Sequence, residues 1–99
     1  MTDLTGKQIR HLRGLGHGLH PHVLIAAAPL SETLWKELEH QIDHHELIKV
    51  KAAIDEREER HRLFAEIADK LHAGFVQELG KTALYYRPNP KKKKPIELP

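Results

Sequence analysis

Apolar residues recur at helical spacing in three segments of the chain. In the first, Thr5 and Gln8 have the spacing of a capping box and precede an apolar face formed by Ile9, Leu12, Leu15 and Leu19. We expect the glycines that follow to loosen the end of this helix and Pro21 to close it; they are Gly14, Gly16 and Gly18. The opposite face carries lysine and arginine, so the pattern predicts an amphipathic helix with one basic side.

The second and third helices follow from the same spacing. Ser31 is a favourable N-cap, Leu30 is placed to contact Trp35 as a hydrophobic staple, and the buried stripe is Leu34, Leu38 and Ile42. The third helix is predicted to begin at Asp55, with Glu58 as its capping partner, and to end at Gly74. Its apolar stripe consists of Leu63, Phe64, Ile67 and Leu71.

Shorter apolar runs between the helices predict four strands, at residues 22–25, 47–53, 75–79 and 82–87. In the second run Lys49 and Lys51 alternate with apolar residues, so the lysines share one face of the strand. Gly80-Lys81 joins the last two runs, and glycine in the first position is typical of a type II′ hairpin. The order α-β-α-β-α-β-β predicts a compact α/β domain with a four-stranded mixed sheet.

Length and composition restrict the class of protein. The 99 residues fit one domain, which we place at residues 1–88, followed by a basic disordered tail at 89–99 that is rich in proline and lysine. The chain has no cysteine, which argues against a disulfide scaffold or a thiolate metal site. Met1 to Gly6 begin no apolar run, and no segment approaches the roughly 18 apolar residues of a membrane span. We therefore expect a cytoplasmic protein with no membrane contact.

Charge is distributed unevenly along the chain. Residues 1–30 carry three basic and one acidic side chain, residues 31–78 carry seven and twelve, and residues 79–99 carry six and one. One interpretation is a face that binds a polyanion. The other is a nearly neutral domain whose flexible basic tail serves only solubility.

Candidates for chemistry are weak. Nine histidines include His40 and His44 at i, i+4 spacing, but no third ligand is evident, so the histidine-based metal site remains only an alternative and no cofactor is expected. Ser31 is explained as a helix cap, and no oriented base is evident beside it. Trp35 falls on the apolar stripe of its helix, which favours core packing over base stacking. The sequence therefore predicts no enzymatic activity.

Basic residues are the remaining candidates. Lys7, Arg10 and Arg13 lie on the water-facing side of the first helix, and His17 extends the row by one turn. Cations at helical spacing can meet successive phosphates, and release of counterions then favours binding. Such a row is also normal on the solvated face of an amphipathic helix. Lys91 to Lys94 add an extended strip of positive charge.

Several blocks of residues together resemble a known family. They are LTGKQIRHLR at 4–13, Leu19 and Pro21, HHELIKVK at 44–51, DERE at 55–58, VQELGKTA at 76–83 and YRP at 86–88. These blocks are similar to the CRM domain in its stand-alone bacterial form, the YhbY-like proteins. The resemblance implies a fold similar to the C-terminal domain of translation initiation factor three. It also implies RNA binding without catalysis, because bacterial members act as assembly factors on precursors of the large ribosomal subunit.

One loop departs from the family pattern. Between the first strand and the second helix the family usually carries Gly-x-x-Gly with a lysine inside, whereas this chain has Ala26-Ala27-Ala28-Pro29. Glycines let backbone amides approach phosphates, but methyl groups obstruct that approach and proline has no amide hydrogen. The amides in the first turn of the second helix could still attract a phosphate. Either RNA affinity has shifted to the first helix and the tail, or this chain binds RNA more weakly.

The sequence therefore predicts a monomeric, non-catalytic protein that binds ribosomal RNA or a pre-ribosomal large-subunit particle. Contacts are expected mostly to phosphate, at Lys7, Arg10, Arg13, His17, Ala26, Ala27, Ala28, Pro29, Arg87, Lys91, Lys92, Lys93 and Lys94. Lys49 and Lys51 join this set if their sheet face is open. The alternative is a protein-interaction adaptor with weakened RNA binding, whose acidic second and third helices are the working surface.

Overall fold

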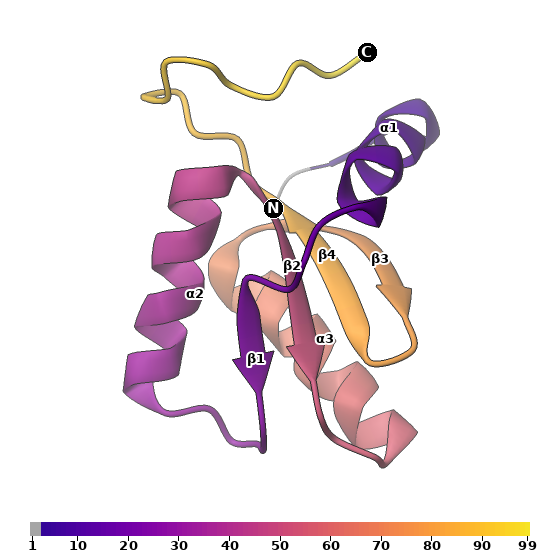
Figure 1. Ribbon diagram of the computed structural model, residues 1–99, viewed down its shortest axis with the longest axis vertical. Helices are drawn as coiled ribbons and strands as arrows, with labels where there is room; N and C mark the ends of the chain where they lie inside the picture. Colours follow the sequence, from indigo (N-terminus) through magenta and orange to yellow (C-terminus); the bar gives the residue numbers. More distant parts are fainter. Residues whose placement is uncertain (1–2) are drawn as a thin grey trace.

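The computed structural model describes residues 3–99, in which three helices and four strands alternate as the sequence predicts (Figure 1). They are α1 (Gly6–His17), β1 (Val23–Ile25), α2 (Glu32–His45), β2 (Leu47–Ala52), α3 (Arg57–Leu71), β3 (Gly74–Leu79) and β4 (Thr82–Tyr86). The prediction of a compact α/β domain is confirmed. No helix within residues 3–99 has the length and hydrophobicity needed to cross a bilayer.

The four strands form one mixed sheet in the order β1-β2-β4-β3. β1 is parallel to β2, whereas β4 is antiparallel to both β2 and β3. The Gly80-Lys81 connection forms the predicted hairpin: Gly80 has φ 59°, and Lys81 is not among the residues of positive φ. A positive φ at the first central position only is what a type II′ turn requires.

The two faces of the sheet carry two separate apolar clusters. The larger cluster lies between the sheet and helices α2 and α3, and its largest members are Ile25, Leu38, Ile42, Phe64 and Tyr85. The smaller cluster lies on the opposite face under α1, and consists of Leu12, Leu47, Val76, Leu84 and Tyr86. Helices therefore cover both faces of the sheet: α2 and α3 cover one face, and α1 alone covers the other.

The starts of α1 and α2 agree with the sequence pattern, whereas α1 ends at His17, before Leu19 and Pro21. The Thr5 hydroxyl accepts a hydrogen bond from the Gln8 amide, and the Gln8 side chain accepts one from the Thr5 amide, which completes the predicted capping box. The Ser31 hydroxyl caps α2 by accepting from the Leu34 amide at 3.1 Å. Leu30 and Trp35 are both half-buried against the larger cluster, as a staple requires.

The predicted ends of α3 are wrong. Glu56 is the N-cap, and its carboxylate accepts hydrogen bonds from the amides of Glu58 and Glu59. Asp55 instead pairs with Lys81 at 2.8 Å, and this hydrogen bond lowers the pKa of the Asp55 carboxyl. The helix ends at Leu71 with His72 in the left-handed conformation, so Gly74 begins β3 rather than ending α3.

Arg60 connects the start of α3 to the neighbouring turn. Its side chain is buried, and its guanidinium donates to the backbone carbonyls of Gly80 at 3.1 Å and Ile54 at 2.7 Å. Carbonyl oxygens therefore satisfy a buried charge that has no carboxylate partner among residues 3–99. This contact fixes the β3–β4 turn against α3.

Candidate nucleic-acid interface

Helix α1 presents a row of cations to solvent because its apolar residues are held against the sheet. Leu12 is buried, Ile9 is half-buried, and Gly16 lies directly over Leu84. Lys7, Arg10, Arg13 and His17 are all exposed on the other side of the helix. Leu15, which we assigned to the apolar face, is 45% exposed because α1 contacts the sheet through Leu12 and Gly16 instead.

Charge is separated across the sheet. Helix α1 contains three lysine or arginine residues and no carboxylate, whereas α2 on the opposite face contains four carboxylates and one lysine. Within residues 3–99, Lys7, Arg10 and Arg13 form no ion pair. An unpaired cation keeps its full attraction for an external anion. The α1 side is thus the side suited to a polyanion.

The C-terminal segment starts at the end of α2 and reaches the α1 side of the sheet with its last residues. Its path is fixed by Glu46, whose buried carboxylate accepts hydrogen bonds of 2.8 Å from the amides of Asn89 and Ile96. Ile96 and Leu98 pack against the smaller cluster, and the Gln8 amide group donates to the Pro99 carbonyl at 3.3 Å. Figure 1 shows this segment running over the top of the domain toward α1.

This segment contains four lysines. Lys91, Lys93 and Lys94 are exposed, whereas Lys92 is half-buried with its Nζ 3.8 Å from Glu46 Oε1. The segment has no helix or strand, in agreement with the sequence. The sequence predicts disorder here, but the structure gives the segment specific contacts. Asn89 and Lys92 contact the end of α2 at Asp43 and Glu46, and only Ile96, Leu98 and Pro99 reach the α1 side of the sheet.

Comparison with known proteins identifies the family. The sequence model of the CRS1/YhbY (CRM) domain family matches residues 4–87 of this chain. The chain belongs to the CRM domain family. A probable RNA-binding protein of Pseudomonas aeruginosa is 42% identical over 91 residues, which cover 92% of this chain and 88% of that protein. An RNA-binding protein of Haemophilus influenzae is 39% identical over 99 residues, covering 100% of this chain and 98% of that protein.

A solved structure supports the same assignment. The solution structure of a Staphylococcus aureus protein, described as a candidate RNA-binding protein, is 32% identical and superimposes with a TM-score of 0.82. The match covers 98% of this chain and 100% of that one. The resemblance inferred from the sequence blocks is thus confirmed in both sequence and fold.

The loop that replaces the Gly-x-x-Gly of the CRM domain lies apart from these cations. Figure 1 shows the connection between β1 and α2 at the opposite end of the sheet from the C-terminal segment. Ala26, Ala27 and Pro29 are exposed, and Ala28 packs against the larger cluster. Glu32 places a carboxylate in the first turn of α2, where it competes with any phosphate for the amides. The structure does not bring this loop together with α1 and the tail.

Arg87 is unsuited to the role that we predicted for it. Its guanidinium contacts Glu39 Oε2 at 2.6 Å and Asp43 Oδ1 at 3.3 Å, and donates to the Leu71 carbonyl at 2.9 Å. Its side chain is only 20% exposed. Arg87 therefore joins α2 to the end of α3 inside the CRM domain, where its charge is already paired.

The histidines form a chain of rings rather than a metal site. His40 and His44 are stacked with 6.3 Å between ring centroids, and His45 lies 4.7 Å from His44 and 4.5 Å from His22. Within the described part of the chain, no group of three metal-ligating side chains could hold an ion. Burial lowers the pKa of both His22 and His45, and the other histidine rings lower that of His45 further.

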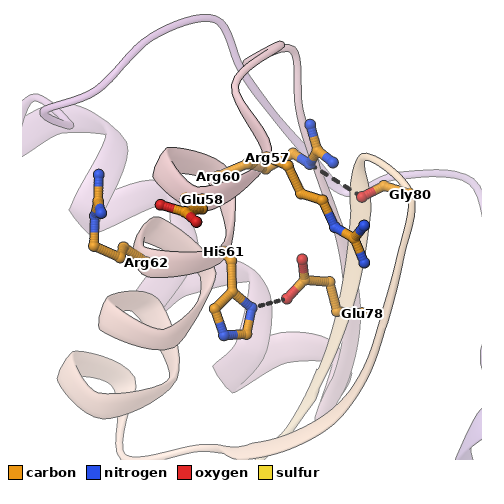
Figure 2. Close-up of a pocket in the computed structure, with 7 residues that line it drawn as sticks. All are labelled: Arg57, Glu58, Arg60, His61, Arg62, Glu78 and Gly80. Carbon is orange, nitrogen blue, oxygen red and sulfur yellow. Dashed lines mark hydrogen bonds and ion pairs between the residues drawn. The ribbon is translucent and has the colours of Figure 1, made fainter.

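A shallow hollow between α3 and the β3–β4 turn was not foreseen from the sequence. Figure 2 shows His61 and Glu78 facing each other in it, with 2.7 Å between Nδ1 and Oε1. Arg57, Glu58 and Arg62 also line it. Its cations and carboxylates are mixed, so it lacks the uniform positive charge of α1. No local pattern in the sequence indicates this hollow, because it depends on the packing of β3 beside α3.

Proposed function

We propose that this chain is a non-catalytic RNA-binding protein that holds its RNA on the α1 side of the sheet. The observation that carries the proposal is the separation of charge: α1 carries three cations that form no ion pair within residues 3–99, and α2 carries four carboxylates. The names of the Pseudomonas aeruginosa and Haemophilus influenzae relatives support RNA as the polyanion. Phosphate contacts supply affinity without reading base sequence, so recognition rests mainly on the shape of the RNA.

The contacts that we propose fall into two groups. Lys7, Arg10, Arg13 and His17 form the first, along one side of α1. Lys7 and Arg13 are six residues apart, so the row extends about 9 Å along the helix. Lys91, Lys93 and Lys94 form the second group, on the segment fastened by Glu46. The 26–29 loop makes at most a separate contact at the far end of the sheet.

We further propose that the RNA is that of the large ribosomal subunit during its assembly in the cytoplasm, with the protein acting as a monomer. This is the role that the stand-alone bacterial form of the CRM domain implies. Crosslinking in cells, followed by sequencing of the attached RNA, tests it. Enrichment of large-subunit precursor RNA supports the proposal, and crosslinks spread evenly over cellular RNA contradict it.

A second experiment separates RNA binding from the adaptor alternative. Purified protein is tested for retention of ribosomal RNA on filters and, in parallel, for capture of purified basic ribosomal proteins. Charge reversal at Glu37 on α2 serves as the matched variant, because this side chain is exposed on the acidic face and forms no ion pair within residues 3–99. RNA retention that survives this variant supports our proposal. Capture of a ribosomal protein that is lost with it, without RNA retention, supports the adaptor.

A further inference from the structure

One end of the sheet is open on the α1 side. Strand register places Leu24, Lys51, Thr82 and Leu79 side by side, one from each strand. Leu24 and Leu79 are 69% and 66% exposed, and Lys51 is exposed between them. Since strands are spaced about 4.8 Å apart, the row extends about 14 Å across the sheet. We call these four residues the open row.

The open row faces the same side as α1. Val23, Ile25 and Ala83 belong to the cluster under α2 and α3, so their neighbours Leu24 and Thr82 point the opposite way. The end of α1 covers the next row along the strands, where Gly16 lies against Leu84. The open row therefore begins where the cover provided by α1 ends.

No described residue covers Leu24 or Leu79, which lie at the two ends of the row with Lys51 and Thr82 between them. The charged residues beside these leucines indicate the chemistry of a partner that would cover them. Lys51 forms no ion pair within residues 3–99, and the neighbouring helix α1 carries cations without carboxylates. The hydroxyl of Thr82 already donates to the Leu79 carbonyl at 2.9 Å, so its oxygen is left as an acceptor. An occupant must combine negative charge with flat or apolar surface.

We propose that unpaired nucleotides of the bound RNA lie across the open row. Lys51 contacts a phosphate, and bases lie on Leu24 and Leu79, while α1 holds the adjoining backbone. Single-stranded RNA exposes base faces that a double helix buries, and sheet faces are used for this purpose in other RNA-binding folds. This inference rests on the proposed function and specifies the form of RNA at the site. An acidic protein segment is the competing occupant.

The test compares an unstructured single-stranded RNA oligonucleotide with a blunt RNA duplex. The double variant Leu24→Ser/Leu79→Ser is expected to lose roughly tenfold in affinity for the single strand, because base contacts are removed, and little for the duplex. The salt dependence should stay unchanged, since no cation is removed. Lys51→Gln should instead reduce the salt slope for the single strand by about 0.7.

Leu15→Ser is the matched control, because Leu15 is an exposed leucine outside the open row. It should leave both affinities unchanged. Unchanged single-strand affinity in the Leu24→Ser/Leu79→Ser variant, with binding still lost on charge reversal in α1, overturns this inference and leaves the proposed function standing. Binding of an acidic peptide that the Leu24→Ser/Leu79→Ser variant loses, with RNA binding unchanged, also overturns it. If charge reversal in α1 is without effect as well, the proposed function itself fails.

Discussion

The buried carboxylate of Glu46 and the backbone amide of Ile96 are joined by a hydrogen bond of 2.8 Å, although the two residues are 50 positions apart. The second oxygen of the same carboxylate accepts from Asn89. Glu46 ends α2 with φ 65°, a backbone conformation that non-glycine residues rarely adopt. One residue thus ends α2 and fastens the C-terminal segment at the end of that helix.

Glu46→Gln should therefore loosen the C-terminal segment. Glutamine has one acceptor oxygen, so its amino group would face an amide that also donates. We expect the free energy of unfolding to fall by about 1–3 kcal/mol, the cost of leaving a buried polar group unsatisfied. Amide hydrogen exchange at residues 89–96 should accelerate. Glu97→Gln, at an exposed position, is the control, and equal exchange in the two variants would contradict the anchoring role.

Gly16 sets how closely α1 approaches the sheet. A Cβ atom at this position would lie 2.6 Å from Leu84 Cδ1, and Leu84 is buried and cannot move away freely. Gly16→Ala should destabilise the fold by about 1–3 kcal/mol through overpacking. Gly14→Ala is the control, because nothing lies within 4 Å of that site. It should be neutral or stabilising by up to about 1 kcal/mol. Urea unfolding measures both.

Arg87→Gln should affect stability and leave RNA binding alone. The variant loses the pairs with Glu39 and Asp43 and the bond to the Leu71 carbonyl. The carboxylates are largely exposed, so we expect a modest loss of about 1–2 kcal/mol. Arg62→Gln is the comparison, as Arg62 has no ion pair within residues 3–99. A reduced salt slope for RNA binding in the Arg87→Gln variant would show that this arginine contacts the RNA and would contradict a purely structural role.

The free energy of unfolding should decrease as the pH falls below 6.5, the ordinary pKa of a histidine side chain. Burial lowers the pKa of His22, so the unfolded chain takes up the proton first and protonation favours unfolding. Nδ1 of the same ring accepts the Lys49 amide at 3.0 Å, which the doubly protonated ring cannot do. His22→Asn keeps an acceptor without a titrating group, so its stability should vary less with pH. Thermal unfolding across this range, with His20→Asn as control, measures the difference.

The elements of the fold could be predicted because their signals are local. Capping residues, helical spacing and the Gly80-Lys81 turn each depend on neighbours in sequence. The start of α3 was misplaced because Asp55 and Glu56 are both acceptable caps, and the local sequence does not distinguish between them. In the structure Glu56 caps the helix, and Asp55 pairs with Lys81.

The candidate site was less predictable because it depends on contacts between distant segments. The cations of α1 were correctly placed on its exposed side, since helical geometry determines that side. The ion pairs of Arg87 could not be foreseen, because the carboxylates that hold it come from α2. Glu46 was missed because a charged residue between a helix and a strand normally faces water. Its burial follows from the return of the C-terminal segment.

Salt dependence of RNA binding tests most directly whether the α1 cations hold the RNA. The variant Arg10→Glu/Arg13→Glu removes two cations from α1, and Lys36→Glu/Lys70→Glu makes the same change in charge on the opposite side of the sheet. We expect the first variant to lower affinity and to reduce the slope of log K against log salt by about 1.4–1.8, whereas the second leaves the slope unchanged. Equal slopes in the wild-type protein and the α1 variant, or equal losses in the two variants, would contradict it.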